Sequence, residues 1–118
     1  NADRSDAFLS LREMNGRYTR GTITNVYFQP VFNETWDGLM TSETSCGEVA
    51  AWYNVTGTGI RVVEMMSPDL EICDGRDIVI EFLEALESAR YVLGDDNYRM
   101  IVLDGDGRPS LFFVMLNG

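Results

Sequence analysis

One segment of this chain, residues 77–90, has a sustained helical period, and no other stretch of the sequence does. Apolar residues recur in it at spacings of three and four, which places them on one face of a helix. That face consists of Val79, Phe82, Leu83 and Leu86, and the opposite face of Asp77, Glu81, Glu84 and Ser88. Because so short a helix is not stable alone, it must pack on a sheet. We therefore predict an α+β domain with one main helix over about residues 77–89.

The sequence before the helix has the composition of strands and turns. A first apolar segment ends at Asn15-Gly16, a dipeptide that tolerates positive φ. Residues 18–32 are rich in β-branched and aromatic side chains, and residues 49–55 and 60–65 form the arms of a predicted hairpin. Alternation within residues 18–32 predicts two faces, Thr22, Thr24, Val26 and Phe28 on one and Ile23, Tyr27 and Val31 on the other.

Residues 33–47 are polar and turn-rich, and we predict a long loop or a weak strand there. After the helix, residues 91–93 and 98–103 are typical of strands, each closed by a run of Gly, Asp and Asn. A last strand is predicted at residues 110–116. The order is therefore strands, one helix, and strands again.

Length and charge limit the classes of protein to consider. The chain has 118 residues, 45% of them apolar, which is enough for a single domain with its own core. We assign residues 1–7 to a polar N-terminal tail and residues 8–118 to the domain. Nineteen acidic and nine basic residues give a formal net charge of −10, which repels nucleic acid and anionic lipid. No apolar run approaches the roughly 20 residues of a transmembrane helix, so we expect no transmembrane segment and no nucleic-acid partner.

The chain contains no histidine, which removes the Ser-His, Cys-His and His-metal arrangements behind most hydrolytic chemistry. A carboxylate pair, Asp95 with Asp96 or Glu81 with Glu84, could still act as acid and base. We favour a solvated role for both pairs, because the first lies in a predicted turn and the second on the polar side of the helix. We predict no catalytic residues and no enzyme activity.

Residues 104–107, Asp-Gly-Asp-Gly, begin like a calcium-binding loop. Such a loop needs an oxygen ligand at its fifth position and a bidentate Glu at its twelfth. This chain has Arg108 and Met115 at those positions. We therefore predict a tight turn there, with no metal site and no cofactor.

Two groups of side chains have alternative interpretations. Trp36 and Trp52, with Tyr27 and Phe28, could form an exposed binding surface, but aromatic side chains in strands usually fill the core, which we favour. The cysteines, Cys46 and Cys73, are either two small buried apolar residues or a bridge between the first hairpin and the approach to the helix. A bridge would stabilise the fold by roughly 3 to 4 kcal/mol.

Several motifs follow one another in a set order along the chain. They are Gly16-Arg17-Tyr18, Cys46 before a hairpin, Ser67-Pro68, Cys73, the helix, and Asp106-Gly107-Arg108 before an apolar strand. This order resembles that of the META domain, the family of HslJ-like heat-shock lipoproteins, over about residues 9–116. The two cysteine motifs differ, since this chain has Ser45-Cys46-Gly47 where the family usually has Gly-Cys-Asn, and Leu-Glu-Ile-Cys at residues 70–73.

The resemblance implies a compact α+β fold in which a strongly curved, barrel-like antiparallel sheet carries one helix. It implies a disulfide between Cys46 and Cys73, which match the cysteine positions of the family. Members are envelope-associated or secreted proteins linked to stress tolerance and virulence, without an established reaction. We therefore expect a bacterial periplasmic, cell-envelope or secreted protein, its signal segment removed.

Three functions follow as hypotheses. The first is a non-catalytic, monomeric domain for stress or virulence that binds a protein partner or stabilises the envelope. The second is a calycin-like carrier of a small apolar ligand, which would need a cavity lined by Phe28, Trp52 and Phe112. The third is a carboxylate-only hydrolase, which would need a converging acidic pair in a cleft. The sequence does not identify ligand-binding residues.

Overall fold

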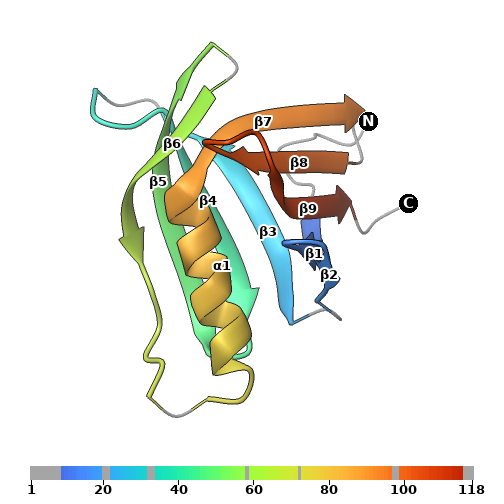
Figure 1. Ribbon diagram of the computed structural model, residues 1–118. Coiled ribbons are helices and arrows are strands. Elements are labelled where there is room, and N and C mark those ends of the chain that lie inside the picture. The colour runs from blue at the N-terminus through green and yellow to red at the C-terminus, as the bar shows by residue number, and fades with distance from the viewer. Residues whose placement is uncertain are drawn as a thin grey trace, which may run out of the picture.

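The computed structural model of this chain describes residues 9–19, 22–31, 34–57, 59–71, 73–96 and 99–115 (Figure 1). The tail assigned to residues 1–7 lies outside them. Within the described residues the elements are β1 (Leu9–Met14), β2 (Arg17–Tyr18), β3 (Ile23–Pro30), β4 (Gly38–Thr44), β5 (Gly47–Thr56), β6 (Gly59–Met66), α1 (Arg76–Ser88), β7 (Ala89–Asp96), β8 (Arg99–Asp104) and β9 (Pro109–Met115). No helix of this described part is long and apolar enough to cross a membrane.

The strands form one antiparallel sheet that closes on itself. Its order is β2-β1-β3-β4-β5-β6-β7-β8-β9, and β1 also pairs with β9. Without the short β2, which extends the sheet beside β1, the described strands make a closed eight-stranded barrel. The predicted fold class, a strongly curved antiparallel sheet with one helix, is confirmed.

The helix closes one end of this barrel. The β1–β2, β4–β5 and β8–β9 turns lie at that end, and α1 crosses it in front of the strands in Figure 1. Hydrogen bonds hold it there. Ser45 in the β4–β5 turn donates to the carbonyl of Asp74, just before the helix, and Glu81 accepts from Asn15 and Arg17 around the β1–β2 turn. The β5–β6 turn and the start of β8 belong to the opposite end.

The apolar face of α1 packs on the inside of the barrel. All four predicted core residues, Val79, Phe82, Leu83 and Leu86, are buried, together with Ala85. The strands contribute the remaining apolar core side chains, Leu11, Met14, Ile23, Val26, Met40, Val49, Ala51, Val102, Leu111 and Phe113, and Ala89 at the start of β7 adds one more. The helix thus takes its stability from the core that it completes.

Two turns form as the sequence predicted. Asn15 and Gly16 both have positive φ, 51° and 82°, as a tight turn between antiparallel strands requires. In the β8–β9 turn, Oδ1 of Asp104 accepts hydrogen bonds from the backbone N–H groups of Asp106 and Arg108. That carboxylate therefore stabilises the turn itself.

Of the two alternatives predicted for residues 33–47, the strand is the one found, at Gly38–Thr44. This segment contains β4, a seven-residue strand paired with β3 on one side and β5 on the other. The inward positions of β4 are Gly38, Met40 and Ser42, all buried. Of these three residues, Gly38 and Ser42 lack a large apolar side chain and Met40 has one. The alternation that marks a half-buried strand is therefore faint in the sequence.

The predicted faces of residues 18–32 were wrong in part. Ile23 and Val26 were placed on opposite sides of the strand, but both are fully buried. The cause is Asn25, whose φ of 51° lies within a register shift between β3 and β4. This bulge inserts one residue and returns the side chains that follow it to the inner face.

Candidate functional site

An apolar pocket opens at the end of the barrel opposite α1. Its volume is about 380 Å³, within the range of small-molecule sites. Five strands and one turn line it, through Phe28 of β3, Tyr53 and Val55 of β5, Gly59 and Ile60 of β6, Val92 of β7, Met100 of β8, and Gly57 between β5 and β6. It is therefore a continuation of the barrel interior toward solvent.

Strand β5 shows how the sequence divides the interior into core and pocket. Its inward positions are Val49, Ala51, Tyr53 and Val55, which alternate with residues of the outer face. Val49 and Ala51 are fully buried beneath α1, whereas Tyr53 and Val55 lie beyond the reach of the helix and line the pocket. Because β5 extends past the core, its last inward side chains, Tyr53 and Val55, lie at the open end of the barrel.

Aromatic rings form the inner wall of the pocket. The ring of Phe28 meets those of Tyr53 and Phe113 edge to face, with centroids 6.0 and 5.9 Å apart. The ring of Tyr53 lies over Gly38, where any Cβ atom would overlap its Cζ and hydroxyl atoms. Glycine at position 38 thus permits the position of the tyrosine ring.

One carboxylate lies next to the lining of this pocket. Asp37, just before β4, accepts a hydrogen bond at Oδ2 from the backbone N–H of Val55, 2.8 Å away. Its own N–H donates to the carbonyl of Tyr53 and to Oδ1 of Asn54, at 3.0 and 2.9 Å. Burial and, second, the negative charge of Asp37 raise the pKa of the Tyr53 hydroxyl, which is therefore neutral at physiological pH.

The structure separates the aromatic residues that the sequence analysis considered together. Phe28 lines the pocket, as the carrier hypothesis required, but Trp52 and Phe112 do not. Trp52 alternates with the inward Ala51 and Tyr53, so it lies on the outer face of β5, where its ring contacts Trp36 at a centroid distance of 5.4 Å. The predicted core position of these two tryptophans was therefore wrong.

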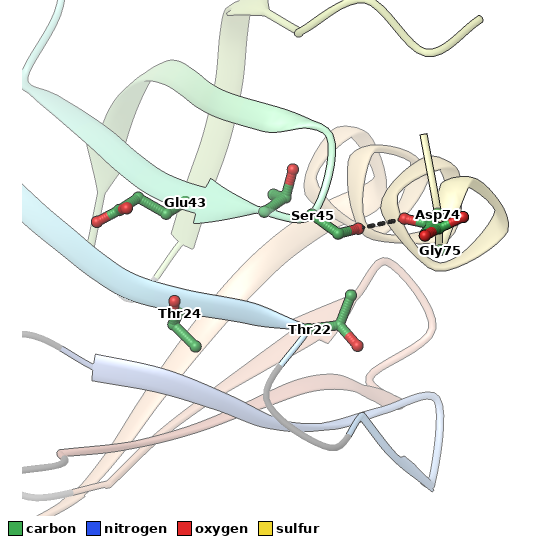
Figure 2. A pocket seen from close by; sticks show the side chains of 7 residues that line it. Thr22, Thr24, Glu43, Ser45, Asp74 and Gly75 are labelled. Carbon is green, nitrogen blue, oxygen red and sulfur yellow. Dashed lines mark hydrogen bonds between the residues drawn. The ribbon is translucent and has the colours of Figure 1, made fainter. Parts of the chain in front are cut away.

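A second, polar hollow lies beside the start of α1 (Figure 2). It has a volume of about 490 Å³ and is lined by Thr22, Thr24, Glu43, Thr44, Ser45, Asp74 and Gly75. Ser45 donates a hydrogen bond from Oγ to the carbonyl of Asp74, 2.6 Å away. The carboxylates of Glu43 and Asp74 lie at opposite sides of the hollow and do not converge.

The acidic pairs nominated from the sequence have other positions. Glu81 accepts hydrogen bonds from Asn15 and Arg17, which lower its pKa, and Glu84 is exposed on the helix. Asp95 and Asp96 end β7, where Asp96 pairs with Arg99 across the hairpin, and their side chains lie outside the described part of the structure. The described residues hold no group of three or more metal-binding side chains.

Cys46 and Cys73 lie at disulfide distance, with Cα atoms 5.2 Å apart. Cys46 belongs to the β4–β5 turn and Cys73 to the segment that leads into α1, so the pair joins the two where the resemblance placed a bridge. The neighbouring hydrogen bond between Ser45 and Asp74 connects the same two segments. A bridge between these two cysteines would fix the start of the helix covalently to the barrel.

These features define a class of protein: a closed eight-stranded antiparallel barrel that one helix closes at one end and an apolar pocket opens at the other. The crystal structure of a DUF4847 family protein from Bacteroides vulgatus has a similar fold, with a TM-score of 0.53 and 15% sequence identity. The similarity covers 64% of this chain and 51% of that one, so it spans about half the length of the neighbour. At this identity it shows the fold alone. No protein-family model and no curated protein matches the sequence.

Proposed function

We propose that this chain is a non-catalytic binding domain that carries a small apolar ligand in the open end of its barrel. The observation that supports this most directly is the pocket of about 380 Å³ with Phe28, Val55, Ile60, Val92 and Met100 in its lining. Apolar area removed from water is the main source of affinity in such sites. Closed antiparallel barrels of eight strands are wide enough to hold one small ligand.

Two observations support a non-catalytic role. Glu81, a member of one nominated pair, accepts hydrogen bonds from Arg17 and Asn15, which lower its pKa and join the helix to the barrel. In the polar hollow, Glu43 and Asp74 do not converge on a common point, as an acid and base pair would need to do.

We also propose that the protein is localised outside the cytoplasm. A cysteine pair at disulfide distance fits the periplasm, the cell envelope or the secreted space, since disulfides persist in oxidising compartments. The barrel with one helix and the position of the cysteine pair also fit the proposed relation to the META domain and a role in stress tolerance.

Protein binding is a second candidate, supported by an apolar surface outside the pocket. Val63 and Met66 of β6 are large apolar residues with exposed fractions of 53% and 60%. Among the described residues, Gly59 is the one residue of β6 that pairs with β7. The rest of this edge of β6 is therefore unpaired and lies at the outer surface. A protein partner at β6 would leave the pocket accessible.

The carrier function is tested by titrating the protein with N-phenyl-1-naphthylamine, a neutral apolar probe whose fluorescence rises in apolar sites. We expect saturable binding at one site in the wild type. Val55→Trp should abolish it by filling the mouth, because Val55 lines the pocket and is already 49% exposed. Val63→Trp is the matched control, since Val63 is similarly exposed but lies outside the pocket. Equal binding by the two variants would reject the pocket as the site.

A further inference from the structure

A carboxylate lies beside the aromatic rings of the apolar pocket, and this combination restricts the charge of a ligand. Asp37 is bonded through its backbone to Tyr53 and through Oδ2 to Val55, two residues that line the pocket. No described residue donates a hydrogen bond to its other oxygen, Oδ1. Asp37 therefore offers a fixed negative charge with an acceptor atom available to a ligand.

The nearest basic residues of the same strands belong to the outer face. Arg61 follows Ile60, and Arg99 precedes Met100, and both of these neighbours line the pocket. Because successive side chains of a strand point to opposite faces, the two arginines project from the outside of the barrel. Among the described residues, the charge beside the mouth is thus that of Asp37, which is negative. The net charge of −10 on the whole chain adds a long-range attraction for cations.

We propose that the ligand of this pocket is an amphiphilic cation, with an apolar body inside the barrel and an ammonium head at Asp37. This inference rests on the proposed carrier function and adds the charge of the ligand to it. Three chemical features of the site suit such a head group. The carboxylate of Asp37 accepts its charge-assisted hydrogen bond, the neutral hydroxyl of Tyr53 offers a second acceptor, and the rings of Tyr53 and Phe28 suit a cation above an aromatic face.

The same site disfavours an anionic amphiphile such as a fatty acid. A carboxylate head at the mouth would lie beside Asp37, and the repulsion of like charges at a low-dielectric surface would weaken binding. A neutral alcohol of equal chain length would gain the apolar contacts without an ionic contribution. The order of affinity should therefore be ammonium, then alcohol, then carboxylate.

The experiment is a competition against N-phenyl-1-naphthylamine with decylammonium, decanol and decanoate, all below their micellar concentrations. In the wild type we expect decylammonium to displace the probe at the lowest concentration and decanoate at the highest. Asp37→Asn keeps an oxygen that can accept the Val55 N–H but removes the charge, so it should weaken decylammonium by about three- to tenfold and leave decanol unchanged. Glu48→Gln, an exposed site at the other end of β5, removes the same charge and should change neither.

The outcomes separate this inference from the carrier function. If decanol and the probe bind but decylammonium shows no preference, or keeps its preference in Asp37→Asn, the cationic ligand is rejected and the carrier function stands. Tightest binding of decanoate would also reject it. If neither the probe nor any of the three amphiphiles binds to the wild type, the carrier function itself is rejected, and the inference with it.

Discussion

Single residues decide the shape of the open end of the barrel. Gly38 is the clearest case, because its missing Cβ gives room to the ring of Tyr53. The sequence offers no sign of this contact, since residues 38 and 53 meet through the pairing of β4 with β5. Phe28 could be nominated for the pocket from its sequence, but Tyr53 and Met100 acquire their roles from strand register, which a local pattern does not contain.

Replacing Gly38 by Ala should displace Tyr53 and destabilise the fold by about 1–3 kcal/mol, the usual effect of overpacking. The free energy of unfolding in urea measures this. Gly94→Ala is the control, because a Cβ at that strand position meets no atom within 4 Å. The pocket probe should also bind Gly38→Ala more weakly than Gly94→Ala. Equal free energies of unfolding of the two variants would show that the Tyr53 ring can move aside without destabilising the fold.

Glu81 should make a pH-dependent contribution to stability. Hydrogen bonds from Arg17 and then from Asn15 lower its pKa in the folded protein. A lowered folded pKa stabilises the fold above the pKa of the unfolded chain, and this stabilisation disappears as pH falls through the folded pKa. Glu81→Gln should therefore be less stable than wild type at neutral pH and equal to it in strong acid. The difference should be small, because Arg17 is largely exposed and solvent screens the pair.

Urea unfolding of Glu81→Gln at several pH values provides the measurement, with Glu84→Gln as the control on the exposed side of the helix. A constant difference across the pH range would contradict the role of the Glu81 charge.

At the scale of elements, the sequence predicted those with a strong period and left residues 33–47, where the period is weak, between a loop and a strand. The helix was correct because four large side chains share one face, and all four are buried. Strand β4 could not be distinguished from a loop because Gly38 and Ser42 occupy inward positions. The bulge at Asn25 was also unpredictable, since one residue with positive φ inverts the faces of β3 without changing its composition.

A substitution in the contact of α1 with the barrel should change the free energy of unfolding more than the other single substitutions considered. Phe82 is fully buried beneath the closed end, and Phe82→Ala should reduce the free energy of unfolding by about 3–5 kcal/mol. Glu84→Ala, on the exposed side of the same helix, should change it little. Chemical denaturation of both variants tests this, and similar losses in the two would mean that the helix does not complete the core.

For the whole molecule, the cysteine pair links distant parts of the sequence. Cys46 and Cys73 are 27 residues apart in the chain. Replacing both by Ser should lower the free energy of unfolding by about 3–4 kcal/mol, because the unfolded chain regains the freedom that the closed loop removes. Thiol titration of unreduced protein from its native compartment should find no free sulfhydryl. Two free sulfhydryls would contradict the predicted oxidation and the proposed location.

In the part of the chain that the structure describes, α1 covers one end of the barrel and the apolar pocket opens at the other. In the proposed carrier function, a ligand would enter and leave this open end past Val55 and Gly57. A substitution that narrows this route without touching the bound ligand should then slow association and dissociation by the same factor. The dissociation constant would stay the same, while the residence time of the ligand would lengthen. The open end would then control the rates of binding and release, and the interior would control the affinity.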